Sequence, residues 1–156
     1  MGTRRDFVAW LSALSLAGLA RPLGADERAE EQAADAARSW LSLVDGGRSS
    51  TSWETAAPAF RVAVSPEQWD QAVRSVRTPL GRCLSRTLRS HRLVDALPGA
   101  PRGPYAVLRF DAEFEHAAQV VETVTPVRGA DDRWRVASYF IDAPATVASL
   151  PGRAAA

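Results

Sequence analysis

The sequence predicts one small α+β domain, with three helices packed on one face of a curved, four-stranded antiparallel sheet in a cone-like arrangement. Two observations lead to this fold class. Apolar residues recur at helical spacing as far as Val76 and afterwards alternate with polar residues as far as Ile141. Helices that precede a run of antiparallel strands, each with one apolar face, are expected to pack together on one side of that sheet.

The first helix is predicted over residues 30–44 and is expected to end at Gly46 and Gly47, which favour a helix C-terminus. Its apolar face consists of Ala33, Ala37, Trp40, Leu41 and Val44. A second, short helix is predicted from Thr51, because Thr51 and Glu54 have the spacing of a capping box. Pro58 is expected to kink or restart this helix. The residues on its apolar side are Trp53, Ala56, Ala57 and Phe60.

The third helix has the clearest start signal in the chain. In Ser65-Pro66-Glu67-Gln68, a serine cap is followed by proline at the first helical position and by a glutamine that completes a capping box. Thr78-Pro79 is predicted to close this helix, because a residue before proline avoids the helical conformation. The apolar face consists of Trp69, Ala72, Val73 and Val76.

Four strands are predicted after the helices, over residues 82–93, 105–115, 120–128 and 133–141. The second strand alternates most regularly, which predicts one buried and one solvated face. Its apolar positions are Ala106, Leu108, Phe110, Ala112 and Phe114. The sequence Gly-Ala-Asp-Asp at residues 129–132 predicts the turn between the last two strands.

This order of elements is similar to that of the nuclear transport factor two-like fold, a cone-shaped α+β domain. A second resemblance rests on six segments that agree in order: WLSLVDGG (residues 40–47), SW (52–53), FRVAVSPEQW (60–69), PLG (79–81), VETVTP (121–126) and RWRV (133–136). Together they resemble the bacterial family called domain of unknown function 4019, over about residues 33–142. That resemblance implies a small exported or envelope-associated domain and implies no activity for any residue.

Residues 1–25 are predicted to be a cleavable signal peptide, because a charged start is followed by an apolar stretch and a small residue at Ala25. Arg4 and Arg5 favour the twin-arginine class, and an ordinary secretory signal is the alternative. The stretch is too short to span a bilayer, so no membrane span is expected in the mature protein. We therefore expect a periplasmic or secreted protein, with one domain over residues 26–143 and a disordered tail over residues 144–156.

Charge and composition exclude several kinds of chemistry. Removing residues 1–25 takes away three arginines and one aspartate, which changes the formal net charge from +1 to −1. This nearly neutral balance gives no indication of nucleic-acid binding. Every basic residue is arginine, so no lysine is available for a Schiff base. The single cysteine, Cys83, is expected to be a small buried apolar residue rather than a nucleophile.

Few residues suggest a reaction centre. His91 and His116 are the only histidines, and their spacing to Glu113 and Glu115 matches no metal-ligand pattern. A solvated acidic face is the favoured interpretation, and no metal, cofactor or catalytic residue is predicted. Tyr105, Glu122 and Tyr139 are the groups that could serve acid–base chemistry in an apolar pocket, although no motif marks them.

The most distinctive local signal is a basic segment over residues 71–94, which contains no acidic residue. Its arginines are Arg74, Arg77, Arg82, Arg86, Arg89 and Arg92. Arg82, Arg86 and Arg89 are the candidate ligand-binding residues, for an anionic partner. The alternative, which we favour, is cross-strand pairing with acidic residues on the neighbouring strands, namely Asp111, Glu113, Glu115 and Glu122.

These observations favour a non-enzymatic module that binds a protein, or a small apolar or anionic ligand, through the concave face of its sheet. A small enzyme that uses the interior of the cone as an acid–base pocket is the alternative, and a homodimer is left open. A closed interior filled with tryptophan would favour protein interaction over both a ligand cavity and a reaction pocket.

Overall fold

The computed structural model describes residues 23–143, which form one α+β unit. The helices are α1 (Leu23–Asp45), α2 (Ser49–Thr55), α3 (Pro58–Ala63) and α4 (Pro66–Ala72), followed by the π-helical turn η1 (Val73–Arg77) and the 3-10 turn η2 (Thr78–Leu80). The strands are β1 (Cys83–Val94), β2 (Tyr105–Phe114), β3 (Ala117–Arg128) and β4 (Trp134–Asp142). The predicted signal peptide lies largely, and the predicted tail entirely, outside the described residues.

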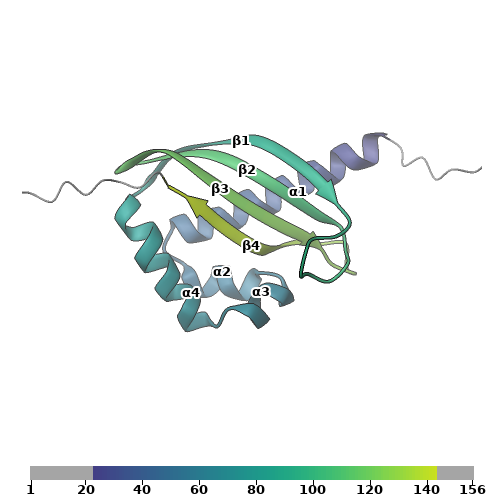
Figure 1. Cartoon of the computed structure of the whole chain (residues 1–156), viewed down its shortest axis with the longest axis horizontal. Helices are drawn as coiled ribbons and strands as arrows, with labels where there is room; N and C mark the ends of the chain where they lie inside the picture. The colour runs from purple at the N-terminus through teal and green to yellow at the C-terminus, as the bar shows by residue number, and fades with distance from the viewer. Residues whose placement is uncertain (1–22, 144–156) are drawn as a thin grey trace, which may run out of the picture.

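The four strands form one antiparallel sheet in the order β1-β2-β3-β4, which arches over the helices (Figure 1). Helix α1 contacts all four strands, and α2, α3 and α4 gather beside β4 (Figure 1). The predicted α+β class, with helices on one face of a four-stranded antiparallel sheet, is therefore confirmed. The predicted count of three helices is wrong, because Pro58 restarts the second helix and gives a separate α3.

The end of α1 follows from its glycines. Gly47 has a φ of +68°, a conformation that glycine adopts without steric cost. The backbone N–H of Arg48 donates to the Leu43 carbonyl (2.9 Å) and that of Gly47 to the Val44 carbonyl (3.1 Å), which is the Schellman pattern of a helix end. All five residues of the predicted apolar face of α1 are buried. The helix itself begins at Leu23, seven residues before the predicted start.

The two predicted capping boxes have different outcomes. The box at Ser65 and Gln68 is present, with both reciprocal hydrogen bonds. The prediction of a capping box at Thr51 is wrong. Helix α2 begins at Ser49, directly after the turn that ends α1, and it has no side-chain cap. The serines there serve tertiary contacts instead. Ser49 Oγ donates to Asp70 Oδ1 (2.6 Å), and Ser52 Oγ accepts from the Trp69 indole (2.9 Å).

The helix that begins at Pro66 changes its geometry halfway, and this change corrects the predicted apolar face. The backbone N–H of Thr78 donates to the Val73 carbonyl, which widens the helix into a π turn. The inward position that regular α-helical spacing assigns to Val76 is therefore taken by Arg77. Arg77 is only 7% exposed, whereas Val76 is 42% exposed.

Aromatic side chains fill the space between helices and sheet. Trp40 packs against Trp69, Phe60 and Tyr139 with ring centroids 5.4, 6.1 and 5.5 Å apart. The Trp40 indole donates to the Ser52 carbonyl (2.7 Å), so its polar edge is satisfied as well. The interior that the sequence suggested as a ligand cavity or reaction pocket is therefore occupied by the core of the domain itself.

The strands follow the predicted alternation. All five predicted apolar positions of β2 are buried, and Arg109, Asp111 and Glu113 between them are exposed. Cys83 is a free cysteine that is half-buried rather than buried, at the beginning of the edge strand β1. Within residues 23–143, no helix is both long and apolar enough to cross a bilayer.

Candidate functional site

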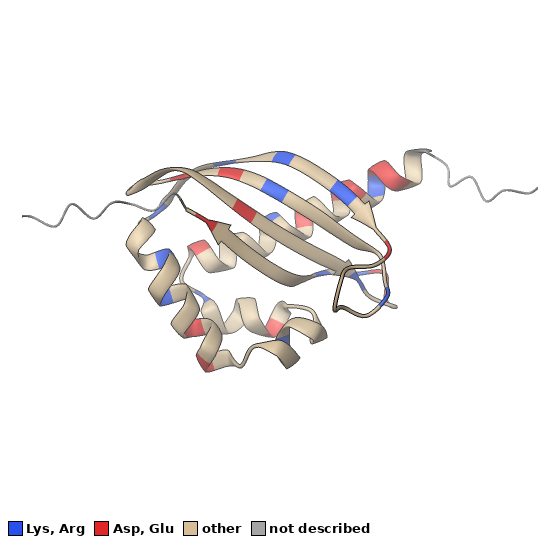
Figure 2. Cartoon of the chain, in the orientation of Figure 1, with Lys and Arg blue, Asp and Glu red and all other residues tan. Residues whose placement is uncertain are grey.

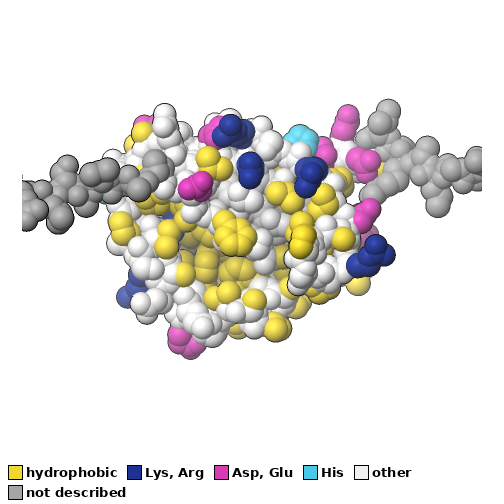
Figure 3. All heavy atoms as spheres, in the orientation of Figure 1, with side chains coloured by type: hydrophobic (Ala, Val, Ile, Leu, Met, Phe, Trp, Pro, Cys, Tyr) yellow, Lys and Arg dark blue, Asp and Glu magenta, His cyan; other side chains and the backbone are white. Residues whose placement is uncertain are grey.

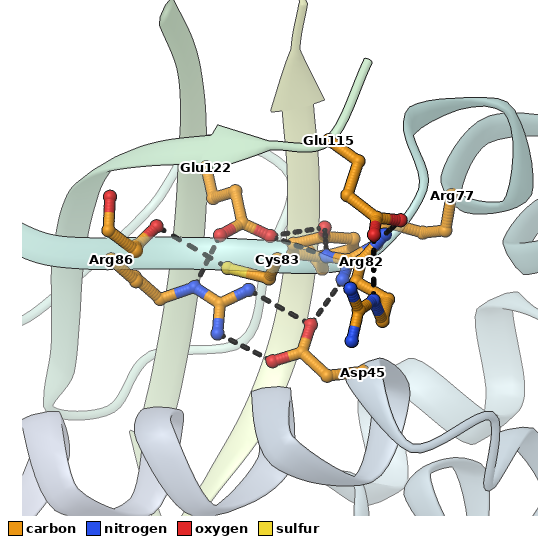
Figure 4. Close-up of polar contacts among 9 residues, drawn as sticks. Asp45, Arg77, Arg82, Cys83, Arg86, Glu115 and Glu122 are labelled. Carbon is orange, nitrogen blue, oxygen red and sulfur yellow. Dashed lines mark hydrogen bonds and ion pairs between the residues drawn. The ribbon is translucent and has the colours of Figure 1, made fainter. Parts of the chain in front are cut away.

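Five side chains from five separate elements meet at one end of the core. They are Asp45 at the end of α1, Arg77 in the π turn, Arg86 on β1, Glu122 on β3 and Tyr139 on β4. We refer to these residues as the Glu122 cluster. Figure 4 shows the Arg86 guanidinium between the carboxylates of Glu122 and Asp45. The Arg77 side chain reaches the same two carboxylates from its helical turn.

Glu122 is fully buried, and both of its oxygens are bound. Oε1 accepts hydrogen bonds from Arg77 Nη1 and from the Tyr139 hydroxyl, each at 2.7 Å. Oε2 accepts from Arg86 Nε at 2.5 Å. Arg77 Nη1 also donates to the Tyr139 hydroxyl at 2.9 Å, which closes a ring of hydrogen bonds. A buried carboxylate is tolerated only when it is paired in this way.

Asp45 binds the same two arginines from the other side. Arg86 forms a two-point contact with its carboxylate, at 2.7 and 3.1 Å, and Arg77 Nη2 donates to Asp45 Oδ1. The Arg77 guanidinium also lies 4.6 Å from the centre of the Phe114 ring, a cation–π geometry. Two carboxylates and two guanidiniums therefore balance one another inside the cluster.

The sheet register places these groups. Glu122 lies opposite Phe110 on β2 and Ile141 on β4, so it points to the side of the sheet that carries the helices. Arg86 lies opposite Ala112, on the same side. The pairing of β1 with β2 and of β2 with β3 thus places Arg86 and Glu122 on one face, within reach of the end of α1.

The environment decides what this cluster can do chemically. Burial by itself raises the pKa of Asp45, but the hydrogen bonds and charges of Arg86 and Arg77 outweigh it and hold that pKa below its usual value. Burial, together with the charge of Glu122, raises the pKa of Tyr139 well above its usual value, although Arg77 opposes the shift. The tyrosine is therefore protonated and the aspartate ionised at neutral pH, which makes the cluster a charge-balanced framework and a poor proton-transfer site.

The three candidate arginines occupy different environments. Arg86 is part of the Glu122 cluster and its side chain is 14% exposed. Arg82 pairs with Glu115 (2.7 Å) and Arg89 with Asp111 (3.4 Å), both at the surface. Figure 2 shows basic and acidic positions next to one another on neighbouring strands. Arg82, Arg86 and Arg89 thus all meet carboxylates, as the favoured alternative predicts; Arg82 and Arg89 pair with Glu115 and Asp111, whereas Arg86 reaches Glu122 on β3 and Asp45 on α1.

The histidines do not come together. His91 Nε2 lies 2.8 Å from a carboxylate oxygen of Glu30 on α1, and His116 is exposed in the turn between β2 and β3. No group of three or more potential metal ligands occurs within residues 23–143. Tyr105, the third acid–base candidate, donates its hydroxyl proton to the Pro101 carbonyl (2.7 Å) and lies far along β2 from Phe110, the residue opposite Glu122.

An apolar pocket of 110 Å³ lies between α4, the π turn and β4, next to the Glu122 cluster. It is lined by Trp69, Ala72, Val73, Val76, Arg77, Tyr139 and Ile141. Figure 3 shows hydrophobic side chains gathered around a hollow on this face of the molecule, below a rim of charged residues. A cavity of about 150 Å³ accommodates one benzene ring, so this pocket suits a single small apolar group and is smaller than the ~300–1,000 Å³ of ordinary ligand sites.

Strand β4 is an edge of the sheet, and its two halves differ. Near its start the Val136 carbonyl accepts a hydrogen bond from the Ala57 backbone N–H (2.8 Å), so the junction between α2 and α3 covers that part of the edge. Farther along, Phe140 is 68% exposed on the side of the sheet away from the helices, opposite Thr123. We call residues 139–142 together with the apolar pocket the β4 edge surface.

The sequence interpretation missed the Glu122 cluster and the β4 edge surface as units. One signal for the cluster was present: Glu122 falls between Val120 and Val124 in the apolar phase of a strand, where a charge requires a buried partner. Arg77 gave no such signal, because regular helical spacing places it beside the apolar face rather than on it.

The chain is thus a small α+β domain whose interior is filled by tryptophans and contains a buried ionic cluster. The chain matches a family model described as "Protein of unknown function (DUF4019)" over residues 36–139, and it belongs to that family. No curated protein and no solved structure matches the chain. The family resemblance noted in the sequence is thereby confirmed.

Proposed function

We propose that this chain is an exported, non-enzymatic interaction module that binds an extended segment of a partner protein along the open half of β4. The observation that carries the proposal is the β4 edge surface, where an exposed phenylalanine and an apolar pocket flank the same short stretch of edge strand. An edge strand offers backbone donors and acceptors to an added strand, and flanking pockets select its side chains.

The interior of the domain favours this function over catalysis. Trp40, Phe60 and Trp69 occupy the space that a reaction pocket would need. Glu122 is the best placed carboxylate, but it is fully buried and both of its oxygens already accept hydrogen bonds from two arginines and Tyr139, which makes it a poor base toward a substrate. The acid–base alternative therefore lacks an available base.

The surface arginines are weaker candidates for the interaction. Arg82 and Arg89 each have a carboxylate partner, and an anionic ligand would have to compete with those pairs. Binding at the β4 edge surface would break no such pair, because Phe140 is 68% exposed among the described residues and the adjoining pocket is lined mainly by apolar groups. We therefore place the interaction at β4.

We expect Phe140→Asp to abolish capture of the partner while changing the free energy of unfolding by less than about 0.5 kcal/mol, since Phe140 is mostly exposed. The partner is first trapped in living cells with a photo-crosslinking amino acid at position 140, then identified and used in binding assays. Leu84, 56% exposed on the opposite edge strand, is the matched control for both the crosslinker and the Asp substitution. No crosslink at position 140, equal crosslinking at both positions, or undiminished capture by Phe140→Asp would refute the proposal.

Export is the second part of the proposal, and it is supported by the layout of residues 1–25. We expect Arg4→Lys combined with Arg5→Lys to leave the precursor in the cytoplasm, because the paired arginines distinguish the twin-arginine signal from the general secretory kind. The measurement is the ratio of precursor to processed protein in cell fractions. Arg28→Lys with Arg38→Lys is the control, and an unchanged periplasmic yield in the Arg4 and Arg5 variant would rule out this pathway.

A further inference from the structure

A polar pocket lies on the outer face of the sheet, the face away from the helices. It has a volume of 470 Å³ and is lined by Arg89 on β1, Asp111 on β2, and Gln119, Val120 and Val121 on β3. Asp111 lies opposite Val121 and is exposed, on the solvated side of β2. The volume falls within the ~300–1,000 Å³ of ordinary ligand sites. We refer to it as the Gln119 pocket.

Two irregularities in the strand pairing place polar side chains beside Asp111. The pairing of β1 with β2 leaves Arg89 as an extra residue between two paired neighbours. On β3, Ala118 and Gln119 both lie opposite the single residue Glu113. Bulges of this kind change the direction of a side chain and are frequent next to functional sites. Here each strand beside β2 has a bulge, and each bulge supplies one residue to the same pocket.

Gln119 has a backbone conformation that glycine would adopt more easily. Its φ is +103°, a range that residues with a side chain rarely occupy, so the backbone is strained at this position. The Gln119 side chain does not offset the strain through an internal hydrogen bond, because it is exposed and has no such partner among the described residues. A ligand bound by the carboxamide would explain why glutamine occupies this position.

The Arg89–Asp111 pair in the same pocket has unused hydrogen-bonding capacity. Arg89 Nη1 and Asp111 Oδ1 are 3.4 Å apart, longer than the usual ~2.7–3.2 Å, and the two side chains are 59% and 57% exposed. The other guanidinium N–H groups and the second carboxylate oxygen have no partner within residues 23–143. An anion would compete with Asp111 and a cation with Arg89, whereas a neutral ligand leaves the pair intact.

We propose that the Gln119 pocket binds one ring of a neutral saccharide, a function separate from the interaction at β4. A hydroxyl donates one hydrogen bond and accepts two, so neighbouring hydroxyls of a sugar ring donate to the Asp111 carboxylate and accept from the Arg89 guanidinium. The Gln119 carboxamide has both donors and an acceptor and binds a further hydroxyl. Val121, a half-buried lining residue, offers an apolar contact to the C–H groups of the ring.

The test is a titration of the ¹⁵N-labelled protein with glucose, mannose, galactose and N-acetylglucosamine. Binding is followed by nuclear magnetic resonance at the Gln119 carboxamide and the Arg89 Nε–H, assigned with Gln119→Gly and Arg89→Lys. We expect at least one of these sugars to shift both signals with a Kd on the order of 1–10 mM, because the contacts are few and exposed. Glycerol, which has no ring, and the charged sugars glucuronate and glucosamine should bind at least about tenfold more weakly.

Gln119→Gly separates ligand binding from folding. It should weaken saccharide binding about tenfold or more, because the carboxamide is lost, and it should raise the midpoint of urea denaturation, because glycine adopts a positive φ without steric cost. Asp132→Gly is the matched control, since Asp132 also has a positive φ (+60°) and does not line the pocket, so saccharide binding should be unchanged. Asp111→Ala should weaken binding about tenfold or more while the domain stays folded.

Three results would overturn the inference: no shift of either signal with any of the four sugars, equal binding of glycerol, or a lower urea midpoint for Gln119→Gly. Tighter binding of glucuronate, or of the blocked amide N-acetylglycinamide, would assign the pocket to an anion or to a peptide and would also overturn it. These outcomes are independent of the proposed function, because Phe140→Asp should leave saccharide binding unchanged and Gln119→Gly should leave partner capture unchanged.

Discussion

Glu122→Gln is expected to destabilise the domain by about 3–5 kcal/mol, because it leaves two buried arginines with Asp45 as their only anionic partner. Glu122 has no exposed surface, so water cannot reach this position to solvate the two arginines that lose their carboxylate partner. A loss of this size is a large fraction of the ~5–15 kcal/mol by which a small domain is stable. Urea denaturation monitored by tryptophan fluorescence measures it.

The matched control is Asp111→Asn, which makes the same change from carboxylate to carboxamide in an exposed pair with Arg89. It should cost less than about 1 kcal/mol, because exposed ion pairs contribute little. Similar losses for the two variants would show that the Glu122 cluster is hydrated and does not behave as a buried ionic group.

A double variant separates the loss of charge balance from the loss of packing. Arg86→Met combined with Glu122→Leu removes one charge of each sign and leaves Arg77 paired with Asp45. The double variant is expected to be more stable than Glu122→Leu alone, because replacing a buried pair by apolar groups is often nearly neutral whereas removing one partner is costly. If the two losses simply add, the arginine and the glutamate do not interact energetically.

Trp40→Ala is the second substitution with a large expected effect, a loss of about 3–5 kcal/mol. Trp40 is 4% exposed, contacts three other aromatic rings and donates to the Ser52 carbonyl, which the substitution would leave without that donor. The same range is expected for Trp69→Ala, whose indole binds the Ser52 hydroxyl. Equilibrium denaturation of each variant gives the values.

Trp53 is the internal control. Helical spacing predicts that Trp53 is buried like Trp40 and Trp69, and the structure changes that expectation. The sequence pattern treats Trp40, Trp53 and Trp69 alike, but Trp53 is only half-buried and stacks with the exposed Arg61 at 5.9 Å. Trp53→Ala should therefore cost clearly less than Trp40→Ala. Equal losses would mean that burial does not set the energetic role of these tryptophans.

The elements and most of their faces could be predicted because they depend on residues close together in the chain. The start of α4 at Ser65 and Pro66, the break at Pro58 and the alternation of β2 each follow from a local pattern that the structure reproduces. The family assignment also came from short segments read in order.

The candidate site could be predicted only in part. Opposite charges on neighbouring strands predicted that the basic segment would pair with acidic residues, without saying which pairs form; the structure pairs Arg82 with Glu115 and Arg89 with Asp111. The placement of Arg86 at Glu122 and Asp45 required the actual register of β1, including its irregularities near Ser85 and Ser90. The alternation of a strand shows which of its residues share a face, but it does not show which residues of the neighbouring strands they contact.

The α+β class, the order of helices before strands, most of the apolar faces and the family could be read from the sequence, because they depend on periodicity and on short turn and cap motifs. The long-range contacts required the tertiary structure: it shows that Arg77 points inward, that Arg77 meets Glu122 from 45 residues away and Asp45 from 32, and that no strand among residues 23–143 pairs with the outer edge of β4. The physical reason is that a π turn and a buried ion pair are stabilised by contacts between distant segments. No local pattern of residues encodes such contacts.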